Sequence, residues 1–413
     1  MKRIKKGLSI TAAKWASLSL IIRIIIGLVL GALCGILIPQ AGAIKILGTV
    51  FVGALKAVAP ILVFVLVTGA IANASGEIGS RFRKVIVLYI ISTLLAAVVA
   101  VAGSFLFPVS MKLSLAAAEG APPSGIYVVV TNLIKNAVSN PISALANANY
   151  IGILFWAIIF GIGLKKLAKK NTINVVNDLS DTVSQAVRWI IQFAPFGILG
   201  LVFEAVSENG MTIFYDYGKL LALLVVCMLI VGLITNPLIV AITLRKNPYP
   251  LVFRCLRDSG VTAFFTRSSA ANIPVNMALC ERLGIHKDFY SVSIPLGATI
   301  NMSGAAVTIT IMTLAVANTM GIVVDIPTAL MLCVLSAIGA CGTSGVAGGS
   351  LLLVPMACSL FSISSDISMQ AVAVGFILGV VQDSLETALN SSGDAIFTAT
   401  AEYSHHEKSG ETV

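Results

Sequence analysis

Charged residues are scarce in this chain. Only 11% of its 413 residues are Asp, Glu, Lys or Arg, whereas 57% are hydrophobic and the mean hydropathy is +0.98. A soluble core cannot hide so much apolar material, so the composition indicates a polytopic membrane protein. The net charge of +9 does not indicate a nucleic-acid partner, because the basic residues form short clusters between apolar runs.

Paired cysteines and common catalytic motifs are also missing. No CxxC pair, P-loop, HExxH or GxSxG run is present, and no His lies within an apolar segment, so the sequence predicts that the protein is not an enzyme. The adjacent His405 and His406 predict a solvated tail and not a metal site. The seven single cysteines are predicted to be structural thiols: Cys34, Cys227, Cys255, Cys280, Cys333, Cys341 and Cys358.

Six apolar segments before residue 245 are long enough, or nearly so, to span a bilayer. They cover about residues 17–38, 46–72, 85–107, 126–164 (broken around Asn140-Pro141), 189–206 and 219–243. Basic clusters precede the first segment and follow the second, fourth and sixth, which predicts a cytoplasmic N-terminus and an uncleaved first span. Gly27, Gly31 and Gly35 in that span predict a face for close helix packing.

The pattern changes after residue 245. Two apolar stretches, about 255–280 and 327–360, are interrupted by polar or Gly-rich runs at 266–274 and 339–350. Each half is too short to cross about 30 Å of hydrocarbon, and irregular backbone at that depth is tolerated only beside protein or a wet cavity. These stretches therefore predict two re-entrant helical hairpins. The charges that flank them predict entry from opposite faces.

A long apolar segment with polar residues inside it follows each hairpin. The first covers about 289–320 and is interrupted at 301–304. The second covers about 367–402 and carries one polar stripe: Asp383, Glu386, Thr387, Asn390 and Asp394. A carboxylate at bilayer depth needs a cavity, an ion or a ligand beside it. Two such units of opposite orientation form an inverted repeat, which predicts a secondary transporter whose site can hold a zwitterion and a cation.

Four sequence runs in this region resemble the dicarboxylate/amino-acid:cation symporters, the glutamate-transporter family. These runs are AFFTRSS at 263–269, PLGATINMSG at 295–304, the Gly-rich interruption at 339–350, and Asp383 with NSSGD at 390–394. The resemblance covers about residues 15–402, and within the family the chain is most similar to the bacterial branch that carries serine and threonine with sodium.

The resemblance implies an all-α membrane fold with eight transmembrane helices and two oppositely oriented hairpins, assembled as a homotrimer in the bacterial cytoplasmic membrane with both termini cytoplasmic. It also implies a scaffold of residues 1–84 and 109–216 and a cytoplasmic tail of 405–413. The remaining residues, 85–108 and 217–404, would form a transport domain that moves like an elevator.

The resemblance implies roles for individual residues as well. Asp383 would hold the amino group of the substrate, and Asn390 its α-carboxylate. The implied substrate-binding set is Arg267, Ser268, Ser269, Ala305, Val346, Gly348, Ser350, Asp383, Glu386, Thr387 and Asn390. One implied sodium site consists of Gly297, Asn301, Asn390 and Asp394, and a second of Thr299 with the carbonyls around Ala340, Cys341 and Thr343; Met302 lies between the two. Oxygen ligands of this kind are those that hard cations prefer.

Three residues depart from the pattern of relatives that carry acidic substrates. Glu386 stands where those relatives have Arg, and Ala305 where they have Thr. A second negative charge repels aspartate or glutamate, whereas Glu386 can accept a hydrogen bond from a Ser or Thr hydroxyl. Ser303 replaces the Asp of the family's third sodium site, although Tyr89, Ser92 and Thr93 retain its other polar groups. We therefore expect fewer coupled sodium ions, about one or two.

Several alternatives remain open on sequence alone. Protons can replace sodium if a buried Asp383 or Glu386 binds one, and other small neutral amino acids or dicarboxylates can be substrates. The protein can instead be an ion channel that uses the polar tips of the two predicted hairpins. Glu386 can instead face lipid headgroups or pair with Arg267, and Arg267 can be structural. Asp383 and Asp394 can belong to a polar network that binds no ligand.

Overall fold

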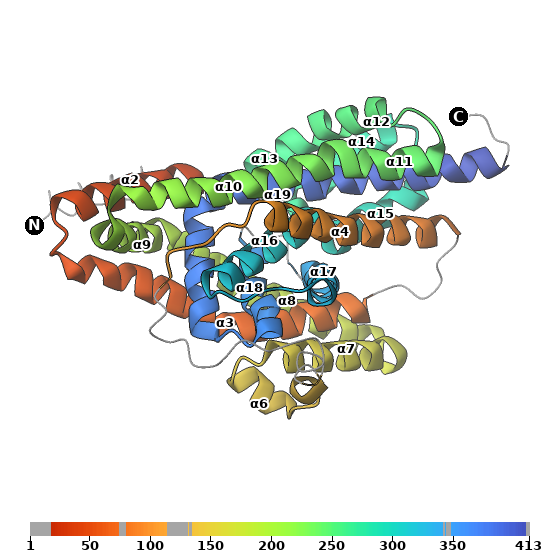
Figure 1. Ribbon diagram of the computed structural model, residues 1–413. Helices are drawn as coiled ribbons and strands as arrows, with labels where there is room; N and C mark the ends of the chain where they lie inside the picture. The colour runs from red at the N-terminus through yellow and green to blue at the C-terminus, as the bar shows by residue number, and fades with distance from the viewer. Residues whose placement is uncertain are drawn as a thin grey trace, which may run out of the picture.

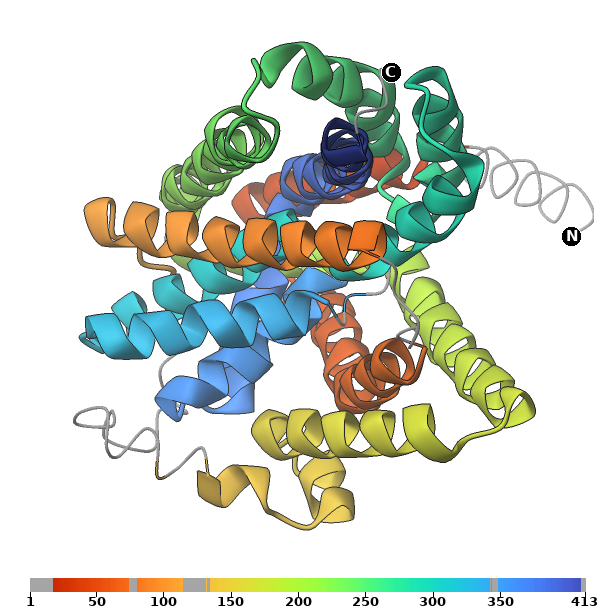
Figure 2. The same cartoon turned by 90° about the vertical axis from the view of Figure 1, so that its right-hand side faces the viewer.

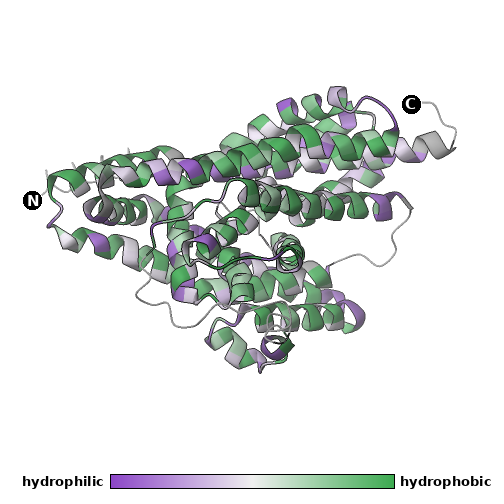
Figure 3. Ribbon diagram, viewed as in Figure 1, coloured by the Kyte–Doolittle hydropathy of each residue, from purple (hydrophilic) through white to green (hydrophobic). Residues whose placement is uncertain are grey.

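The protein is described here by a computed structural model that covers residues 18–73, 80–113, 131, 134–341, 343 and 348–409. Within those ranges it forms helices and no strand. Figure 1 shows long helices lying side by side, and Figure 3 shows that most of their length is apolar. Six helical segments are long and apolar enough to span a membrane, or seven if a bent pair counts as one span: 42–69, 81–106, 150–167, 210–244, 287–319 and 365–405. A polytopic membrane protein is thus confirmed.

One group of helices comes from the first half of the chain. Its members are α2 (Leu20–Leu37), η1 (Gly42–Ile44), α3 (Lys45–Ala72), α6 (Pro141–Ala146), α7 (Tyr150–Leu167), α8 (Lys170–Gln192) and α9 (Ala194–Asn209). The helix α3 packs against α7, α8 and α9, and α2 packs against α9. In both ribbon views α6 and α7 lie at the edge farthest from α12 (Tyr249–Cys255) and α14 (Ser269–Arg282).

The predicted break at Asn140-Pro141 is confirmed. The Asn140 side chain accepts hydrogen bonds from the backbone N–H groups of Ile142 and Ser143, and so caps α6. The helix α6 is short, and a second break at 147–149 precedes α7. The membrane-length helix of this segment therefore begins only at Tyr150.

The predicted segment 189–206 was wrong in its boundaries. The helix α8 ends at Gln192, α9 runs from Ala194 to Asn209, and the two are bent by 54°. Pro195 has no backbone N–H and its ring fixes φ, so it fits the first turn of α9 but not the interior of a continuous helix. The apolar signal of 189–193 belongs to the end of α8.

The three glycines of α2 pack against the backbone of α9. A Cβ built on Gly27 would lie 2.1 Å from the carbonyl oxygen of Pro195, and one on Gly31 would lie 2.5 Å from that of Leu199. These distances are shorter than any van der Waals contact, so only glycine permits the approach. The predicted packing role of this face is confirmed.

The second group of helices contains α4 (Ser80–Leu106) and most elements after residue 209. The chain first forms η3 (Gly210–Thr212), α10 (Ile213–Ile230), the π-helical turn η4 (Val231–Thr235) and α11 (Asn236–Leu244). The segments expected to form the two hairpins follow, and we call them hairpin 1 and hairpin 2. Hairpin 1 consists of α12, η5 (Leu256–Gly260) and α13 (Val261–Thr266) before its break and α14 after it. Hairpin 2 consists of α17 (Ile326–Ala340), η6 (Ser350–Leu353), α18 (Val354–Cys358) and η7 (Ser359–Phe361).

The predicted helix interruptions at 266–274 and 301–304 are confirmed, the first with a shift. The third, at 339–350, lies partly outside the described residues, between the end of α17 at Ala340 and the start of η6 at Ser350. Hairpin 1 breaks only at Arg267 and Ser268, and Pro274 lies inside α14, so this break is shorter than the sequence predicts. The segment after hairpin 1 breaks at Asn301 and Met302, between α15 (Lys287–Ile300) and α16 (Ser303–Thr319).

The helix α16 forms the centre of the second group and contacts α4, α17, α18 and α19 (Ser365–Ser409). In the hydropathy window of 287–319, 94% of residues are buried, against 39% for 42–69. All residues of 303–317 in α16 are buried, so α16 and the break before it are enclosed by protein, whereas α15 is partly exposed and α3 keeps a large apolar surface exposed. The polar break at 301–302 lies inside this enclosed part.

Candidate functional site

The break between α15 and α16 faces the polar stripe of α19. Asn301 Nδ2 donates to Asp394 Oδ1 at 2.9 Å and to the backbone carbonyl of Asn390 at 3.1 Å. All three residues are buried. The structure thus joins Asn301, Asn390 and Asp394, three of the four residues expected at the first sodium site, by direct hydrogen bonds.

Two buried oxygen atoms in this cluster have no hydrogen-bond partner within the described residues: Asn301 Oδ1 and Asp394 Oδ2. Gly297, the fourth predicted ligand, is next to them, since a Cβ there would lie 2.7 Å from Asp394 Oδ1. Buried polar atoms are nearly always paired, so unpaired carboxylate and amide oxygens indicate a missing partner with positive charge. The donor set of oxygens with one carboxylate fits a hard cation such as sodium.

Asp383 is held by the tips of both hairpins. Its Oδ2 accepts a hydrogen bond from Arg267 Nε at 2.6 Å, and its Oδ1 accepts one from the backbone N–H of Gly348 at 2.9 Å. Arg267 adopts a left-handed backbone conformation with φ 52°, which costs energy for a residue with a Cβ. Gly348 has φ 72°, and a Cβ there would lie 2.7 Å from the Phe376 ring. Both tips are thus shaped to reach this carboxylate.

Glu386 is the second buried carboxylate of the stripe, with 5% of its surface exposed. Its Oε2 accepts hydrogen bonds from the Thr308 hydroxyl at 2.7 Å, the Ser350 hydroxyl at 2.8 Å and Gln382 Nε2 at 2.5 Å. Glu386 does not face lipid headgroups, and Arg267 pairs with Asp383 instead, so those two interpretations were wrong. Hairpin 2 therefore contacts both carboxylates, one through Gly348 and the other through Ser350.

The remaining predicted substrate residues lie on α19, on α16 and at the start of α14. Asn390 Oδ1 accepts from the Gly304 N–H at 2.7 Å, and Asn390 Nδ2 lies 3.3 Å from Met302 Sδ. Thr387 donates to the backbone carbonyl of Asp383. Ser268 caps α14, and Ser269 and Ala305 are buried. Val346 lies outside the described residues.

The second predicted sodium site is only partly brought together. The Cys341 thiol at the end of α17 lies 3.4 Å from the Ile300 carbonyl, which places the hairpin 2 tip beside the end of α15. The Thr299 hydroxyl, however, donates to the Leu296 carbonyl of its own helix, and Thr343 donates to Ala340. In the described part of the tip, Cys341 thus contacts the Ile300 carbonyl of α15.

Sequence reasoning missed several residues of the site. Gln382 and Thr308 were not predicted, yet both donate to Glu386. A clasp of Ser259, Asn272, Asn276 and Ser391, which joins hairpin 1 to α19, was also missed in full; both amides donate to Ser391 Oγ, at 2.7 and 3.1 Å. Gln382 could have been found, because it lies one turn before Glu386 on the same face of the helix.

The model of the sodium:dicarboxylate symporter family matches residues 20–404. The chain belongs to this family. It is 55% identical over 410 residues to the serine/threonine transporter SstT of Bifidobacterium adolescentis, covering 99% of this chain and 95% of that protein. It is 56% identical over 405 residues to the protein of the same name from Streptococcus agalactiae, covering 98% and 99%. A Streptococcus thermophilus transporter of that name is 55% identical over 396 residues, covering 96% and 98%. The family resemblance inferred from the sequence is confirmed.

Proposed function

We propose that this protein imports serine and threonine by sodium symport across the cytoplasmic membrane of a bacterium. Similarity over nearly the whole chain to relatives named serine/threonine transporters supports this substrate class. The observation that carries the proposal is the environment of Glu386, whose Oε2 already accepts hydrogen bonds from two alcohol groups, those of Thr308 and Ser350. A serine or threonine side chain offers the same donor, and an acidic side chain would be repelled.

The amino group of the substrate binds to Asp383 in this proposal. In the structure that carboxylate is neutralised by Arg267 and by the Gly348 N–H. A substrate ammonium supplies the same positive charge, so it can replace the Arg267 guanidinium without leaving the buried carboxylate unpaired. Arg267 then pairs with Asp383 between transport cycles and keeps its charge balanced. The α-carboxylate of the bound substrate lies near Asn390 and the N-terminal backbone of α14.

Sodium binding is coupled to substrate binding through Asn390. We call Gly297, Asn301, Asn390 and Asp394 the cation cluster. The Asn390 backbone carbonyl accepts a hydrogen bond from Asn301 of this cluster, while its side-chain amide contacts Met302 and Gly304. A cation at Asp394 therefore orders the same residue that holds the substrate. A second cation would bind where hairpin 2 meets Ile300. Ser303 Oγ is buried without a partner in the described region and carries no charge, which supports fewer ions than in acidic-substrate relatives.

We assign the transport cycle to an elevator movement within a homotrimer, with eight transmembrane helices, two hairpins and cytoplasmic termini. The two packing groups of helices support a scaffold of α2, α3 and α7–α9 and a transport domain of α4 and α10–α19. The boundaries at 84/85 and 216/217 fall inside α4 and α10, so we move them to the residues before Ser80 and Ile213.

Uptake of labelled serine into sealed vesicles that contain the purified protein tests this function. We expect uptake that requires an inward sodium gradient and that excess threonine inhibits more than aspartate. If alanine inhibits serine uptake as strongly as threonine does, the substrate hydroxyl does not contribute to recognition. Uptake driven by a proton gradient without sodium, sodium flux independent of substrate, or strong inhibition by aspartate would each reject the proposal.

A further inference from the structure

The polar stripe of α19 does not end at Asp394. It continues toward the C-terminus at intervals of four residues, with Thr398 and Glu402, both fully buried. Residues spaced by four lie on one face of a helix, so these side chains point in the same direction as Asp394. Neither residue belongs to the cation cluster or to the substrate residues described above.

Thr398 forms one level of contacts between three helices. Its hydroxyl lies 2.9 Å from the Tyr89 hydroxyl of α4 and donates to Ser293 Oγ of α15 at 3.1 Å. The Tyr89 hydroxyl is also 3.2 Å from the Ser293 carbonyl and 3.3 Å from the Asp394 carbonyl. We call Tyr89, Ser293 and Thr398 the hydroxyl level.

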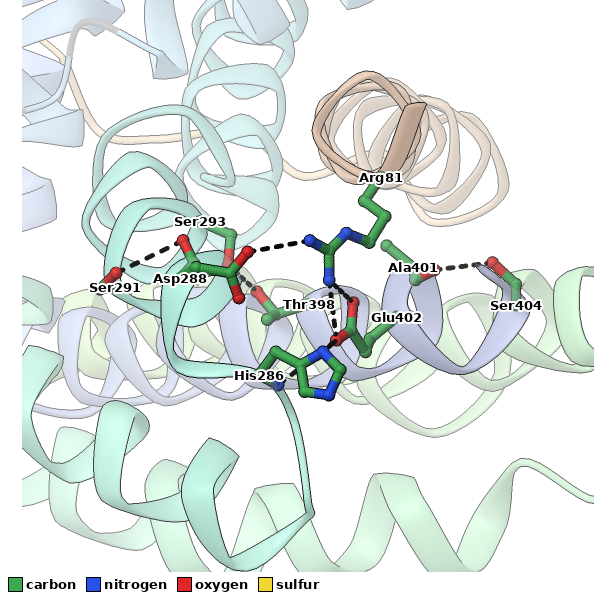
Figure 4. Close-up of polar contacts among 9 residues, drawn as sticks. All are labelled: Arg81, His286, Asp288, Ser291, Ser293, Thr398, Ala401, Glu402 and Ser404. Atoms are coloured by element: carbon green, nitrogen blue, oxygen red, sulfur yellow. Dashed lines mark hydrogen bonds and ion pairs between the residues drawn. The ribbon is translucent and has the colours of Figure 1, made fainter. Parts of the chain in front are cut away.

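Glu402 forms a second level between the same three helices, shown in Figure 4. Arg81 of α4 donates through Nη1 to both Glu402 oxygens, at 3.1 and 3.2 Å, and through Nη2 to Asp288 of α15 at 2.9 Å. The backbone N–H of His286 donates to Glu402 at 3.3 Å. The Glu402 side chain is 0% exposed and that of Arg81 is 23% exposed. We call Arg81, Asp288 and Glu402 the charged level.

The two levels and the cation cluster follow one another along the helices. Arg81 precedes Tyr89 by eight residues on α4, and Glu402 follows Asp394 by eight on α19. On α15, Asp288, Ser293 and Gly297 occur in matching order, and a Cβ on Gly297 would lie 2.8 Å from the Tyr89 hydroxyl as well as 2.7 Å from Asp394. Therefore α4, α15 and α19 are joined at two levels just beyond the cation cluster.

Buried ion pairs contribute little net stability, because desolvation offsets the attraction, but they can fix the register of the elements that they join. The forked guanidinium of Arg81 suits this role, since it reaches carboxylates on two different helices at once. The substrate carboxylates Asp383 and Glu386 are held differently, by the hairpin tips and α16. The charged level is thus connected to the cation cluster more directly than to the substrate pocket.

We propose that Arg81 and Glu402 are positioning residues that set the sodium affinity of the cluster around Asp394, without contacting the ion or the substrate. This inference rests on the proposed function. It predicts that a change at the charged level weakens sodium binding while the serine pocket, once sodium is saturating, remains intact.

The experiment measures thermal unfolding of the purified full-length protein against sodium concentration without serine, with choline replacing sodium at constant ionic strength. For Glu402→Gln we expect the half-saturating sodium concentration to rise about three- to tenfold, which lies in the lower part of the range of coupling between residues joined through contacts. The KM for serine uptake at saturating sodium should stay within about twofold of the unmodified protein. Arg81→Lys keeps the charge but loses the fork, so it should shift the sodium response in the same direction by a smaller factor.

A matched control is Arg282→Gln at the end of hairpin 1. Arg282 lies 3.6 Å from an Asp258 oxygen of the same hairpin and does not join α4 to α19. Its sodium titration should equal that of the unmodified protein. If Glu402→Gln does not fold, Glu402→Asp supplies the same measurement. An unchanged half-saturating sodium concentration in the Glu402 variant, or an equal rise in serine KM at saturating sodium, overturns the positioning role. Absence of any sodium response in the unmodified protein would instead overturn the proposed function.

Discussion

At the residue scale, Asp394 is the group on which sodium coupling depends most directly in our proposal. It is the one carboxylate of the cation cluster, and its Oδ2 is buried without a partner among the described residues. Asp394→Asn preserves the shape and removes the charge. We expect the half-saturating sodium concentration of serine uptake to rise more than about tenfold, equivalent to about 1.4 kcal/mol.

The sodium titration of serine uptake in vesicles measures this effect, with Asp178→Asn on the exposed face of α8 as a control that should behave like the unmodified protein. A sodium dependence in Asp394→Asn equal to that of the control would show that this carboxylate is not a ligand of the coupled ion.

Glu386 decides the choice of substrate in our proposal. Glu386→Gln keeps a hydrogen-bond acceptor but loses the charge, and hydrogen bonds to charged groups contribute about 1.5–3 kcal/mol. We therefore expect the KM for serine and threonine to rise about tenfold or more, while the KM for alanine changes less. The ratio of serine to alanine KM measures the hydroxyl contact separately from general damage. If both substrates weaken equally, Glu386 supports the pocket through Thr308 and Ser350 and does not contact the substrate.

Glu386→Arg reverses the charge at the same position. We expect serine uptake to fall and aspartate to become a competitor, because the repulsion of an acidic side chain is replaced by attraction. Competition of unlabelled aspartate against labelled serine measures the change. Undiminished serine uptake in this variant would place Glu386 outside the pocket.

At the scale of elements, the contact between α2 and α9 depends on glycine. A Cβ on Gly31 would lie 2.5 Å from a backbone oxygen, which cannot move like a flexible side chain. We expect Gly31→Ala to destabilise the protein by about 1–3 kcal/mol, as overpacking does. Gly163→Ala is the control, since nothing lies within 4 Å of a Cβ at Gly163. Thermal unfolding in detergent compares the two, and equal melting temperatures would contradict the packing role.

The sequence predicted helix breaks best where a local signal causes them. Asn140 before Pro141 and the polar run at 301–304 both interrupt apolar segments, and both breaks are present. The bend at Phe193 was not predicted, because 189–206 is largely apolar and only Pro195 marks the start of a new helix. Hydropathy detects where a chain can enter a membrane, whereas the direction of each helix depends on packing with distant elements.

In the site, too, local features were predictable from the sequence and contacts between distant residues were not. The polar face of α19 was predictable because a helical period places Asp383, Asn390 and Asp394 together. The partners of these residues were predictable only through the family resemblance, since Arg267, Asn301 and Gly348 are distant in the sequence. The pairing of Asp383 with Arg267, and of Arg81 with Glu402 across 321 residues, depends on the tertiary fold and carries no local signal.

At the scale of the whole molecule, an elevator movement requires α19 to slide past α3. Among the described residues, one ion pair joins α3 to α19, that of Lys56 on α3 with Asp366 in the first turn of α19. Its side chains are 40% and 66% exposed, so its contribution to stability is small. The pair nevertheless marks two positions that are adjacent in this state and would separate during transport.

A tether between those two positions tests the movement itself. We expect the double variant Lys56→Cys and Asp366→Cys, in a background whose native cysteines are replaced by serine, to lose serine uptake after treatment with a short bifunctional thiol reagent and to regain it after reduction. The matched control tethers Lys45 on α3 to Glu208 on α9, another ion pair, but one within the proposed scaffold. Because α3 and α9 should stay together throughout the cycle, that tether should leave uptake intact. Equal uptake with both tethers closed would mean that α3 and α19 move as one body, and transport would then require rearrangement of the hairpins alone.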